Sequence, residues 1–278
     1  MSVAVHAIRT GSVRIKTAQI RGRGHGLARR MSIFRDPNWS DWLPTFAWLI
    51  DHPDGPILVD TGQGKHLLDH AASWHPYLRW EVGFKMGAED EIGPKLKAMG
   101  LSPRDIGKTV LTHLHVDHDG GLAHLANVDI FVHPGELETA KGVLGRIRGY
   151  LPNRWPSWFD PQPLVFVPSD GPSPARRDLT SDGAVFAVAT PGHTRDHISV
   201  FALVDPATDL HVCMAGDTSY TQQLMVDGLV DGVSGDERQA MSTLAWLRSF
   251  AASHPTIYLP THDPDGERRL LSGETVKL

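Results

Sequence analysis

Three histidines and one aspartate behind a short apolar run carry the strongest chemical signal in this sequence. Within residues 113–118 the chain places His113, His115, Asp117 and His118, and two glycines follow at 120 and 121. Imidazole and carboxylate are the side chains that bind borderline divalent cations such as zinc. On one tight loop they would repel one another when protonated and strip water from one another, and a bound cation removes both costs. The spacing therefore predicts a metal site.

Single candidate ligands follow three later apolar runs in the same way. His193 comes after the run that ends at residue 189, Asp217 after the run that ends at 214, and His262 after the run that ends at 259. Each lies within two residues of a glycine or a proline, where a backbone turns sharply. One loop cannot complete two metal sites, so we expect the fold to bring these three side chains to the first cluster.

The elements that must position these residues are short strands and amphipathic helices. We expect strands at residues 3–8, 13–15, 46–50, 56–59, 109–111, 129–132, 184–189, 197–203, 210–214 and 257–259, and helices at 89–99, 134–141 and 236–252. The last helix would bury one face, formed by Met241, Leu244, Leu247 and Phe250. Residues 20–42 show no clean period and predict an extended loop. Without repeats or a flexible linker, residues 1–278 are expected to form one domain, with loop insertions near 20–45 and 142–182.

Composition and charge exclude several classes of function. The chain of 278 residues is 41% hydrophobic and 21% charged, as in ordinary globular proteins. A net charge of −5 gives no case for binding nucleic acid or an anionic membrane surface, and a small-molecule substrate fits better. The sequence contains no stretch of about 18 apolar residues, the length that could span a bilayer. The start has neither the basic residues nor the long apolar run of a signal peptide, so we expect a cytoplasmic protein. The single cysteine, Cys213, rules out an internal disulfide and is expected to be a buried strand thiol.

The order of these motifs resembles the metallo-β-lactamase superfamily, in which a His-x-His-x-Asp-His loop is followed by a Gly-His, an Asp and a final His. The resemblance covers about residues 45–263. It implies an α/β (α+β) fold, the αββα sandwich, with two mixed sheets face to face, helices outside and metal ions along one edge. It also implies two divalent cations, with zinc first and cobalt, iron or manganese as alternatives. The implied ligands are His113, His115 and His193 for one ion, Asp117, His118 and His262 for the other, and Asp217 as the bridge.

Such a centre is suited to hydrolysis. Two divalent cations about 3.5–4 Å apart lower the pKa of a bridging water toward neutrality, so that a metal-bound hydroxide is present at pH 7. The cations also polarise a carbonyl and stabilise the oxyanion that forms on attack. Asp117 could hold the hydroxide and pass its proton to the leaving oxygen. Because Asp117 and Asp217 are the two carboxylates in the ligand set, the centre stays net positive, which favours an electron-rich ester oxygen.

Within the superfamily, residues 216–221 and 259–264 look like the N-acyl homoserine lactonases, the quorum-quenching enzymes. This resemblance implies that Tyr220, three residues after Asp217, hydrogen-bonds the lactone carbonyl or ring oxygen. The predicted function is opening of the lactone ring of an N-acyl homoserine lactone. Packing of Tyr220 on the sheet remains an alternative role. So do hydrolysis of another lactone, an ester or a phosphotriester, and a metal-binding sensor without turnover.

Two segments rich in large side chains could line a groove for the acyl chain or form the interface of a homodimer, and the sequence leaves both open. They contain Met31, Phe34, Trp39, Trp42 and Phe46, and Tyr150, Leu151, Trp155, Trp158 and Phe159.

Polar residues near the motifs receive supporting roles. His197 and Asp60 are expected to orient ligands, with Asp60 acting on a ring such as that of His115. Structural roles are expected for His124 and His133.

Overall fold

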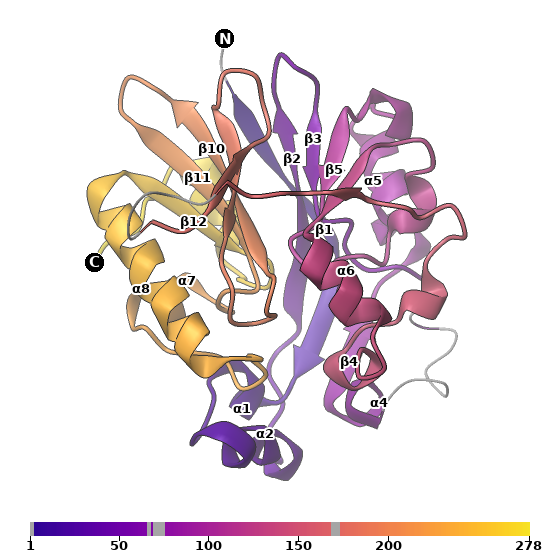
Figure 1. The fold of residues 1–278 in the computed structure, drawn as a ribbon, viewed down its shortest axis with the longest axis vertical. Coiled ribbons are helices and arrows are strands. Elements are labelled where there is room, and N and C mark those ends of the chain that lie inside the picture. Colours follow the sequence, from indigo (N-terminus) through magenta and orange to yellow (C-terminus); the bar gives the residue numbers. More distant parts are fainter. Residues whose placement is uncertain (1–2, 66–67, 69–75, 168–172) are drawn as a thin grey trace.

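Two mixed β-sheets packed face to face form the centre of the fold (Figure 1). The computed structural model describes residues 3–65, 68, 76–167 and 173–278. Within these residues the larger sheet has the order β4-β1-β2-β3-β5-β6-β7 and the smaller sheet the order β12-β11-β10-β9-β8. Strands β3, β5, β6 and β7 run parallel to one another, as do β11 and β12, and the remaining pairs are antiparallel.

The strands are β1 (Ala4–Ile15), β2 (Leu43–Asp51), β3 (Ile57–Val59), β4 (Val82–Lys85), β5 (Lys108–Val110), β6 (Ile130–Val132), β7 (Gln162–Pro163), β8 (Arg176–Asp178), β9 (Val185–Ala189), β10 (Ile198–Asp205), β11 (Leu210–Gly216) and β12 (Thr256–Pro260). The helices are α1 (Thr17–Ile20), α2 (Gly26–Arg35), α4 (Pro76–Glu81), α5 (Ile92–Ala98), α6 (Pro134–Lys141), α7 (Gln222–Val226), α8 (Glu237–Ser253) and α9 (Gly266–Ser272). Short 3₁₀ turns lie between them, at Ala88–Asp90, Pro103–Asp105, Leu122–His124, Arg146–Arg148 and Pro152–Arg154.

Strand β2 shows how the sequence builds the layers. Side chains alternate between the two faces of a strand. Phe46, Trp48 and Ile50 therefore point into the core between the sheets, where they meet residues of the smaller sheet. Ala47 and Leu49 point to the opposite face and pack in a second cluster. With both faces covered, β2 is buried along its whole length except at its last residue.

Helices cover the outer face of each sheet. Ile92 and Leu96 of α5 and Ala140 of α6 pack in the cluster outside the larger sheet. Leu244 and Leu247 of α8 pack in the cluster outside the smaller sheet (Figure 1). The predicted αββα sandwich is confirmed. No helix within the described ranges has the length and apolarity that crossing a bilayer requires.

Several predicted elements were wrong or incomplete. The strands predicted at 3–8 and 13–15 are one strand, β1, which begins at Ala4 and whose pairing with β2 shifts register between Arg9 and Ser12. The expected loop at 20–42 contains helix α2. This helix is fixed by tertiary contacts that its sequence pattern does not reveal: Ile33 is buried, and Nε of Arg29 donates to the Asp231 carbonyl over 2.8 Å. The helix predicted at 89–99 is a 3₁₀ turn followed by the shorter α5.

The insertion at 142–182 carries the two short 3₁₀ turns at Arg146–Arg148 and Pro152–Arg154 and the edge strands β7 and β8. Residues 168–172 of this insertion lie outside the described residues. The predicted buried thiol of Cys213 is confirmed, because its side chain is fully buried in β11.

The buried face of α8 differs from the predicted one at Met241, which is 54% exposed, whereas Leu244 is fully buried. We therefore expect Leu244→Ala to lower the free energy of unfolding by about 2–5 kcal/mol, because it leaves a cavity beside the smaller sheet. Met241→Ala is the matched control on the same helix and should change stability by less than about 0.5 kcal/mol. Urea denaturation measures both. Equal losses in the two variants would contradict this packing.

Candidate metal centre

The candidate ligands lie where four strands end. The loop with His113, His115, Asp117 and His118 follows β5, and the other three candidates follow β9, β11 and β12. The structure brings the side chains of all seven predicted residues together, in overlapping groups that could hold metal ions.

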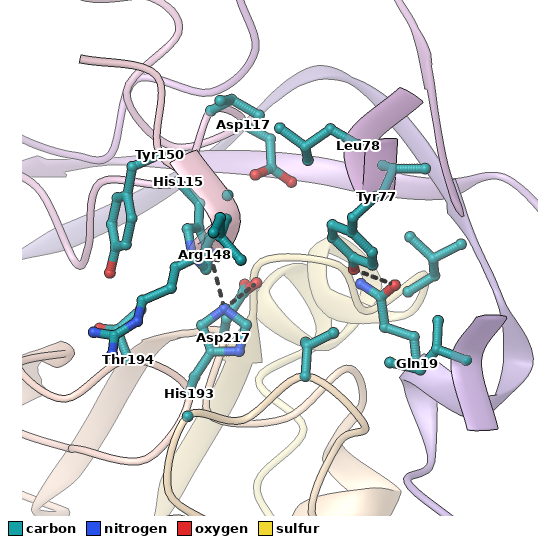
Figure 2. A pocket seen from close by; sticks show the side chains of 18 of the residues that line it. Gln19, Tyr77, Leu78, His115, Asp117, Arg148, Tyr150, His193, Thr194 and Asp217 are labelled. Atoms are coloured by element: carbon teal, nitrogen blue, oxygen red, sulfur yellow. Dashed lines mark hydrogen bonds and ion pairs between the residues drawn. The ribbon is translucent and has the colours of Figure 1, made fainter. Parts of the chain in front are cut away.

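The first group consists of His113, His115 and His193. Nδ1 of His115 lies 3.0 Å from Nε2 of His113 and 3.1 Å from Nε2 of His193. A tetrahedral zinc ion with bonds of 2.0–2.1 Å separates neighbouring ligand nitrogens by about 3.3 Å, so the three nitrogens are placed at nearly the required spacing. Oδ2 of Asp217 faces the same point, 3.6 Å from Nε2 of His193 (Figure 2).

The second group consists of Asp117, His118 and His262. Nε2 of His262 lies 3.4 Å from Oδ2 of Asp117. The other carboxylate oxygen of Asp217, Oδ1, lies 3.3 Å from Nε2 of His118 and 3.5 Å from Nε2 of His262. The two oxygens of Asp217 thus face the two groups, which is the arrangement that a bridging carboxylate requires.

Unsatisfied polar atoms show that this cluster fits cations. Nε2 of His118 and Oδ1 of Asp217 are buried, and neither forms a hydrogen bond with another described residue. Buried polar groups nearly always have a partner. A divalent cation between the groups would supply the missing interaction to both atoms. The donor set of imidazoles and carboxylates suits zinc and other first-row ions.

The outer ring nitrogens of two candidate ligands are held by acceptors. Nδ1 of His118 donates to Oδ2 of Asp60 over 2.8 Å, and Nδ1 of His262 donates to the Pro44 carbonyl over 2.9 Å. Because a carboxylate or a carbonyl only accepts, each ring carries its proton on Nδ1. When Nε2 gives up its own proton to a cation, its lone pair points into the cluster. Asp60 orients His118 and not His115, the ring that we expected from the sequence.

The ring of His115 is fixed in the same way, and the outer nitrogen of His193 faces a carboxylate. Nε2 of His115 donates to the Arg148 carbonyl over 2.8 Å, which leaves Nδ1 as its inner atom. Nδ1 of His193 lies 3.5 Å from Oδ2 of Asp231, and this carboxylate also accepts from the backbone N–H groups of Val233 and Ser234.

His197 makes a hydrogen bond to the backbone of the candidate ligand Asp217. Its Nε2 accepts a hydrogen bond from the N–H of Asp217 over 3.1 Å, while its Nδ1 faces the Thr190 carbonyl at 3.2 Å. The close approach depends on Gly216, which has φ +57° and whose missing Cβ would lie 2.5 Å from Nε2 of His197. His197 therefore holds the turn that carries Asp217, in line with the orienting role expected for it.

The histidines expected to be structural lie outside these groups. His133 caps α6 by accepting from Gly135 N, and Nε2 of His124 lies 3.3 Å from Oε2 of Glu91.

Interactions between charges inside the cluster shift the pKa values of the imidazoles in opposite directions. Burial, then His193, lowers the pKa of His115 to about 3. Burial also opposes the charged form of His262, but Asp217 and Asp117 outweigh it and raise the pKa of this ring to about 10. In the same way, burial opposes the ionised form of Asp217, while His262 and His118 hold the pKa of its carboxyl well below the usual value. The metal-free cluster thus keeps protons on some rings, and cations would displace them on binding.

Glu136 is a supporting residue that the sequence analysis missed. This buried carboxylate of α6 accepts hydrogen bonds from Leu114 N over 3.2 Å, from Tyr150 Oη over 2.7 Å and from Thr194 Oγ1 over 2.9 Å. It therefore ties together the loop after β5, the turn that ends at Tyr150 and the loop after β9. An acidic residue in the first turn of a helix is normally explained by the helix dipole, so the sequence offered no signal for this role.

Tyr220 lies beside the cluster. Its ring stacks on that of His262, with centroids 5.7 Å apart, and only 5% of the residue is exposed. Burial raises the pKa of its phenol well above the usual value, so the hydroxyl keeps its proton.

A cavity of about 700 Å³ opens over the cluster, with His115, Asp117, His193, Asp217, Tyr220 and His262 in its wall. Much of the remaining wall is apolar and comes from β1, α2, the α4–β4 region and residues 144–147. These apolar residues are Val13, Ile15, Ile33, Phe34, Leu78, Val82, Phe84, Leu144 and Ile147. Of the ten large residues that the sequence analysis offered for a groove, Phe34 and Tyr150 line this cavity.

The other large residues offered for a groove mostly pack elsewhere. The Arg14 guanidinium lies over the rings of Trp39 and Trp42, with its central carbon 4.9 and 5.1 Å from their centroids. Nε1 of Trp155 donates to Oδ2 of Asp119 over 2.6 Å. Phe46 belongs to the core between the sheets. Of the two roles that the sequence left open, lining the groove therefore applies to few of these residues, and Trp39, Trp42, Phe46 and Trp155 have other partners.

The family model of the metallo-beta-lactamase superfamily matches residues 40–262. The chain belongs to this superfamily, and it is a metal-dependent hydrolase.

Curated relatives and solved structures are similar over most of the chain. An N-acyl homoserine lactonase from Bacillus sp is 28% identical over 228 residues, which cover 81% of this chain and 84% of the relative. The N-acyl homoserine lactonase AttM from Rhizobium radiobacter is 27% identical over 236 residues, covering 82% and 85%. A solved structure of an N-acyl homoserine lactone hydrolase, with N-hexanoyl-L-homoserine bound at its catalytic metal centre, gives a TM-score of 0.78 at 23% identity and covers 96% of each chain. At this identity the structural likeness establishes the fold.

The contact between Asp60 and His118 predicts that metal affinity depends on Asp60. Asp60→Asn should weaken metal binding by about 10–100-fold, because the amide no longer holds the His118 ring and its tautomer as firmly. Asparagine tolerates the positive φ of 60° at this position, so the fold should persist. Competition with a chromogenic chelator measures the affinity.

Asp51→Asn provides the matched control, because Oδ2 of Asp51 makes a similar 2.8 Å contact with His6 on the surface. Metal affinity should be unchanged in this variant. Unchanged affinity in Asp60→Asn as well would show that Asp60 does not orient a ligand.

Proposed function

We propose that this hydrolase opens the lactone ring of N-acyl homoserine lactones at a centre of two divalent cations, with zinc as the first candidate. The observation that carries the proposal is the position of Asp217, whose two oxygens face two separate groups of candidate ligands. One cation would be held by His113, His115 and His193, and the other by Asp117, His118 and His262, with Asp217 bridging them.

The reaction adds water across the ester bond of the ring and yields a hydroxy acid. When bound, the two cations would lower the pKa of water at the centre and withdraw charge from the substrate carbonyl. Asp117 lines the cavity, and its carboxylate would take a proton from the attacking water. The same carboxylate would then return the proton to the ring oxygen as the carbon–oxygen bond breaks. No nucleophilic side chain is needed for this reaction.

Tyr220 is the second catalytic residue in this proposal. Its hydroxyl keeps a proton and lies in the wall of the cavity, where it would donate a hydrogen bond to the carbonyl or ring oxygen of the substrate. A donor aimed at an oxygen that gains negative charge stabilises the transition state more than the ground state.

The cavity and the relatives support an acyl lactone as the substrate. Apolar residues of β1, α2 and the α4–β4 region line one side of the cavity, away from the candidate ligands, and a volume of about 700 Å³ accommodates a ring with an acyl chain. The two curated relatives are both named N-acyl homoserine lactonases.

The proposal is tested with purified protein and a panel of N-acyl homoserine lactones that differ in tail length and 3-oxo substitution. We expect ring opening, followed as acid release at constant pH, to be abolished by a chelator and restored by added zinc. A simple carboxylic ester and a phosphotriester complete the panel. If these are cleaved and no lactone is opened, the substrate assignment is wrong, and a protein that retains two metal ions without cleaving anything would be a sensor.

We expect removal of the Tyr220 hydroxyl to affect the rate but not metal binding. Tyr220→Phe should lower kcat by about 1–3 kcal/mol of transition-state stabilisation, roughly 5–150-fold, with unchanged metal content. Metal analysis and steady-state kinetics on the same preparation measure the two quantities. An unaltered kcat would leave Tyr220 with a packing role against His262.

A further inference from the structure

Tyr220 is the end of a buried chain of three hydrogen-bonding side chains. Oη of Tyr77 donates to Oε1 of Gln19 over 2.6 Å, and Nε2 of Gln19 donates to Oη of Tyr220 over 2.8 Å. All three residues line the cavity over the candidate metal centre. Figure 2 shows Gln19 and Tyr77 pointing toward each other, to the right of His193 and Asp217.

The backbone of Gln19 is held firmly. Its carbonyl accepts from Gly232 N over 2.7 Å. Its neighbours in α1 are fixed by one carboxylate oxygen, because Oδ2 of Asp36 accepts from Thr17 Oγ1 over 2.6 Å and from Ala18 N over 2.7 Å. The residue itself is 5% exposed. The Gln19 amide therefore has a fixed anchor and little freedom to move away from Tyr220.

The orientation of the Gln19 amide in the structure decides where the Tyr220 hydrogen points. A primary amide has one acceptor oxygen and two N–H donors, whereas a phenol has one O–H donor and an oxygen that accepts. Tyr77 occupies the Gln19 oxygen, so the amide nitrogen faces Tyr220. The Tyr220 oxygen therefore accepts, and its own hydrogen remains available for an oxygen in the cavity.

We propose that Gln19 is a positioning residue that directs the Tyr220 hydroxyl hydrogen toward the substrate oxygen, with Tyr77 fixing the orientation of the Gln19 amide. This inference rests on the proposed function, because Gln19 would act through Tyr220 on the oxygen of the substrate that reacts. Without the N–H of Gln19, the Tyr220 hydroxyl could donate to a different acceptor, and it would then have to rotate toward the substrate as charge develops there. A donor already aimed at that oxygen avoids this reorganisation.

Gln19→Glu is the decisive variant, because it keeps the size of the side chain and replaces the donor with an acceptor. Tyr220 would then donate to the introduced carboxylate and not to the substrate. We expect kcat to fall at least tenfold, toward the value of Tyr220→Phe, with KM changed less than threefold. Gln19→Met, which offers neither donor nor acceptor, should give a smaller loss.

The control for added negative charge is Gln239→Glu. Gln239 is exposed at another part of the cavity wall, and its substitution introduces the same charge away from Tyr220. The loss of kcat in Gln19→Glu should exceed that in Gln239→Glu at least fivefold. Metal content and the melting temperature of each variant show that the centre and the fold persist.

A double-mutant cycle separates positioning from a general structural role. In a Tyr220→Phe background the hydroxyl is absent, so Gln19→Glu should lower kcat no further, and a non-hydrolysable lactam analogue should bind equally to the single and double variants. In the wild-type background, Gln19→Glu should weaken binding of this lactam. Additive losses in the cycle, or a Gln19→Glu enzyme as fast as Gln239→Glu, would overturn the inference.

The two proposals fail in different ways. If the wild-type protein opens no lactone but cleaves the simple ester, the substrate assignment fails, and the cycle is run with that ester. If lactones are opened and the cycle is additive, only the role of Gln19 is wrong. If no substrate is cleaved, lactam binding alone decides, and equal binding by wild type and Gln19→Glu would reject the role of Gln19.

Discussion

The whole centre depends on one constraint: an imidazole that binds a cation must turn the lone pair of one nitrogen inward, so its other nitrogen carries the proton and donates a hydrogen bond to an acceptor outside the cluster. The Pro44 carbonyl sets this choice for His262, and Asp60 sets it for His118. These acceptors lie on the larger sheet or directly after one of its strands, while His262 follows a strand of the smaller sheet. The packing of two sheets therefore determines not only where the rings lie but also which of their nitrogens can bind a cation. Without cations, the same cluster balances its carboxylates by keeping protons on some rings, as the raised pKa of His262 shows.

Part of the cavity wall comes from a different part of the chain than the candidate ligands. Gln19 belongs to the N-terminal segment, outside the residues 40–262 that match the superfamily, and Phe34 of the same segment lines the cavity. This segment reaches the centre through specific polar contacts, such as the bond between the Gln19 carbonyl and Gly232. The part of the chain that matches the family model thus holds all the candidate ligands, and the N-terminal segment contributes to the wall of the cavity above them. Such a division allows one metal centre to serve different substrates, because the cavity wall can change while the cluster is kept.

The sequence predicted the metal cluster more completely than the cavity, for a physical reason. A ligand needs a particular side chain at the end of a strand, and strands such as β5 and β11 are short apolar runs that a sequence displays. A cavity wall needs only apolar surface at the right place, and many segments offer it. Trp39 and Trp42 look like groove residues in the sequence, but Arg14 holds both rings. Leu78 and Val82, which do line the cavity, lie in elements that no periodic pattern indicated.

The sequence by itself determined the chemistry of the candidate ligands, their order along the chain and the strands that carry them, because residue type and local periodicity are properties of short segments. Only the tertiary structure decided the partners. It assigned Asp60 to His118, buried Glu136 between three loops and placed Gln19 against Tyr220, a residue 201 positions away. Each of these contacts joins segments distant in the chain, and hydrogen-bond geometry depends on positions fixed to a few tenths of an ångström. Packing of the two sheets and their helices sets those positions, and no local pattern encodes them.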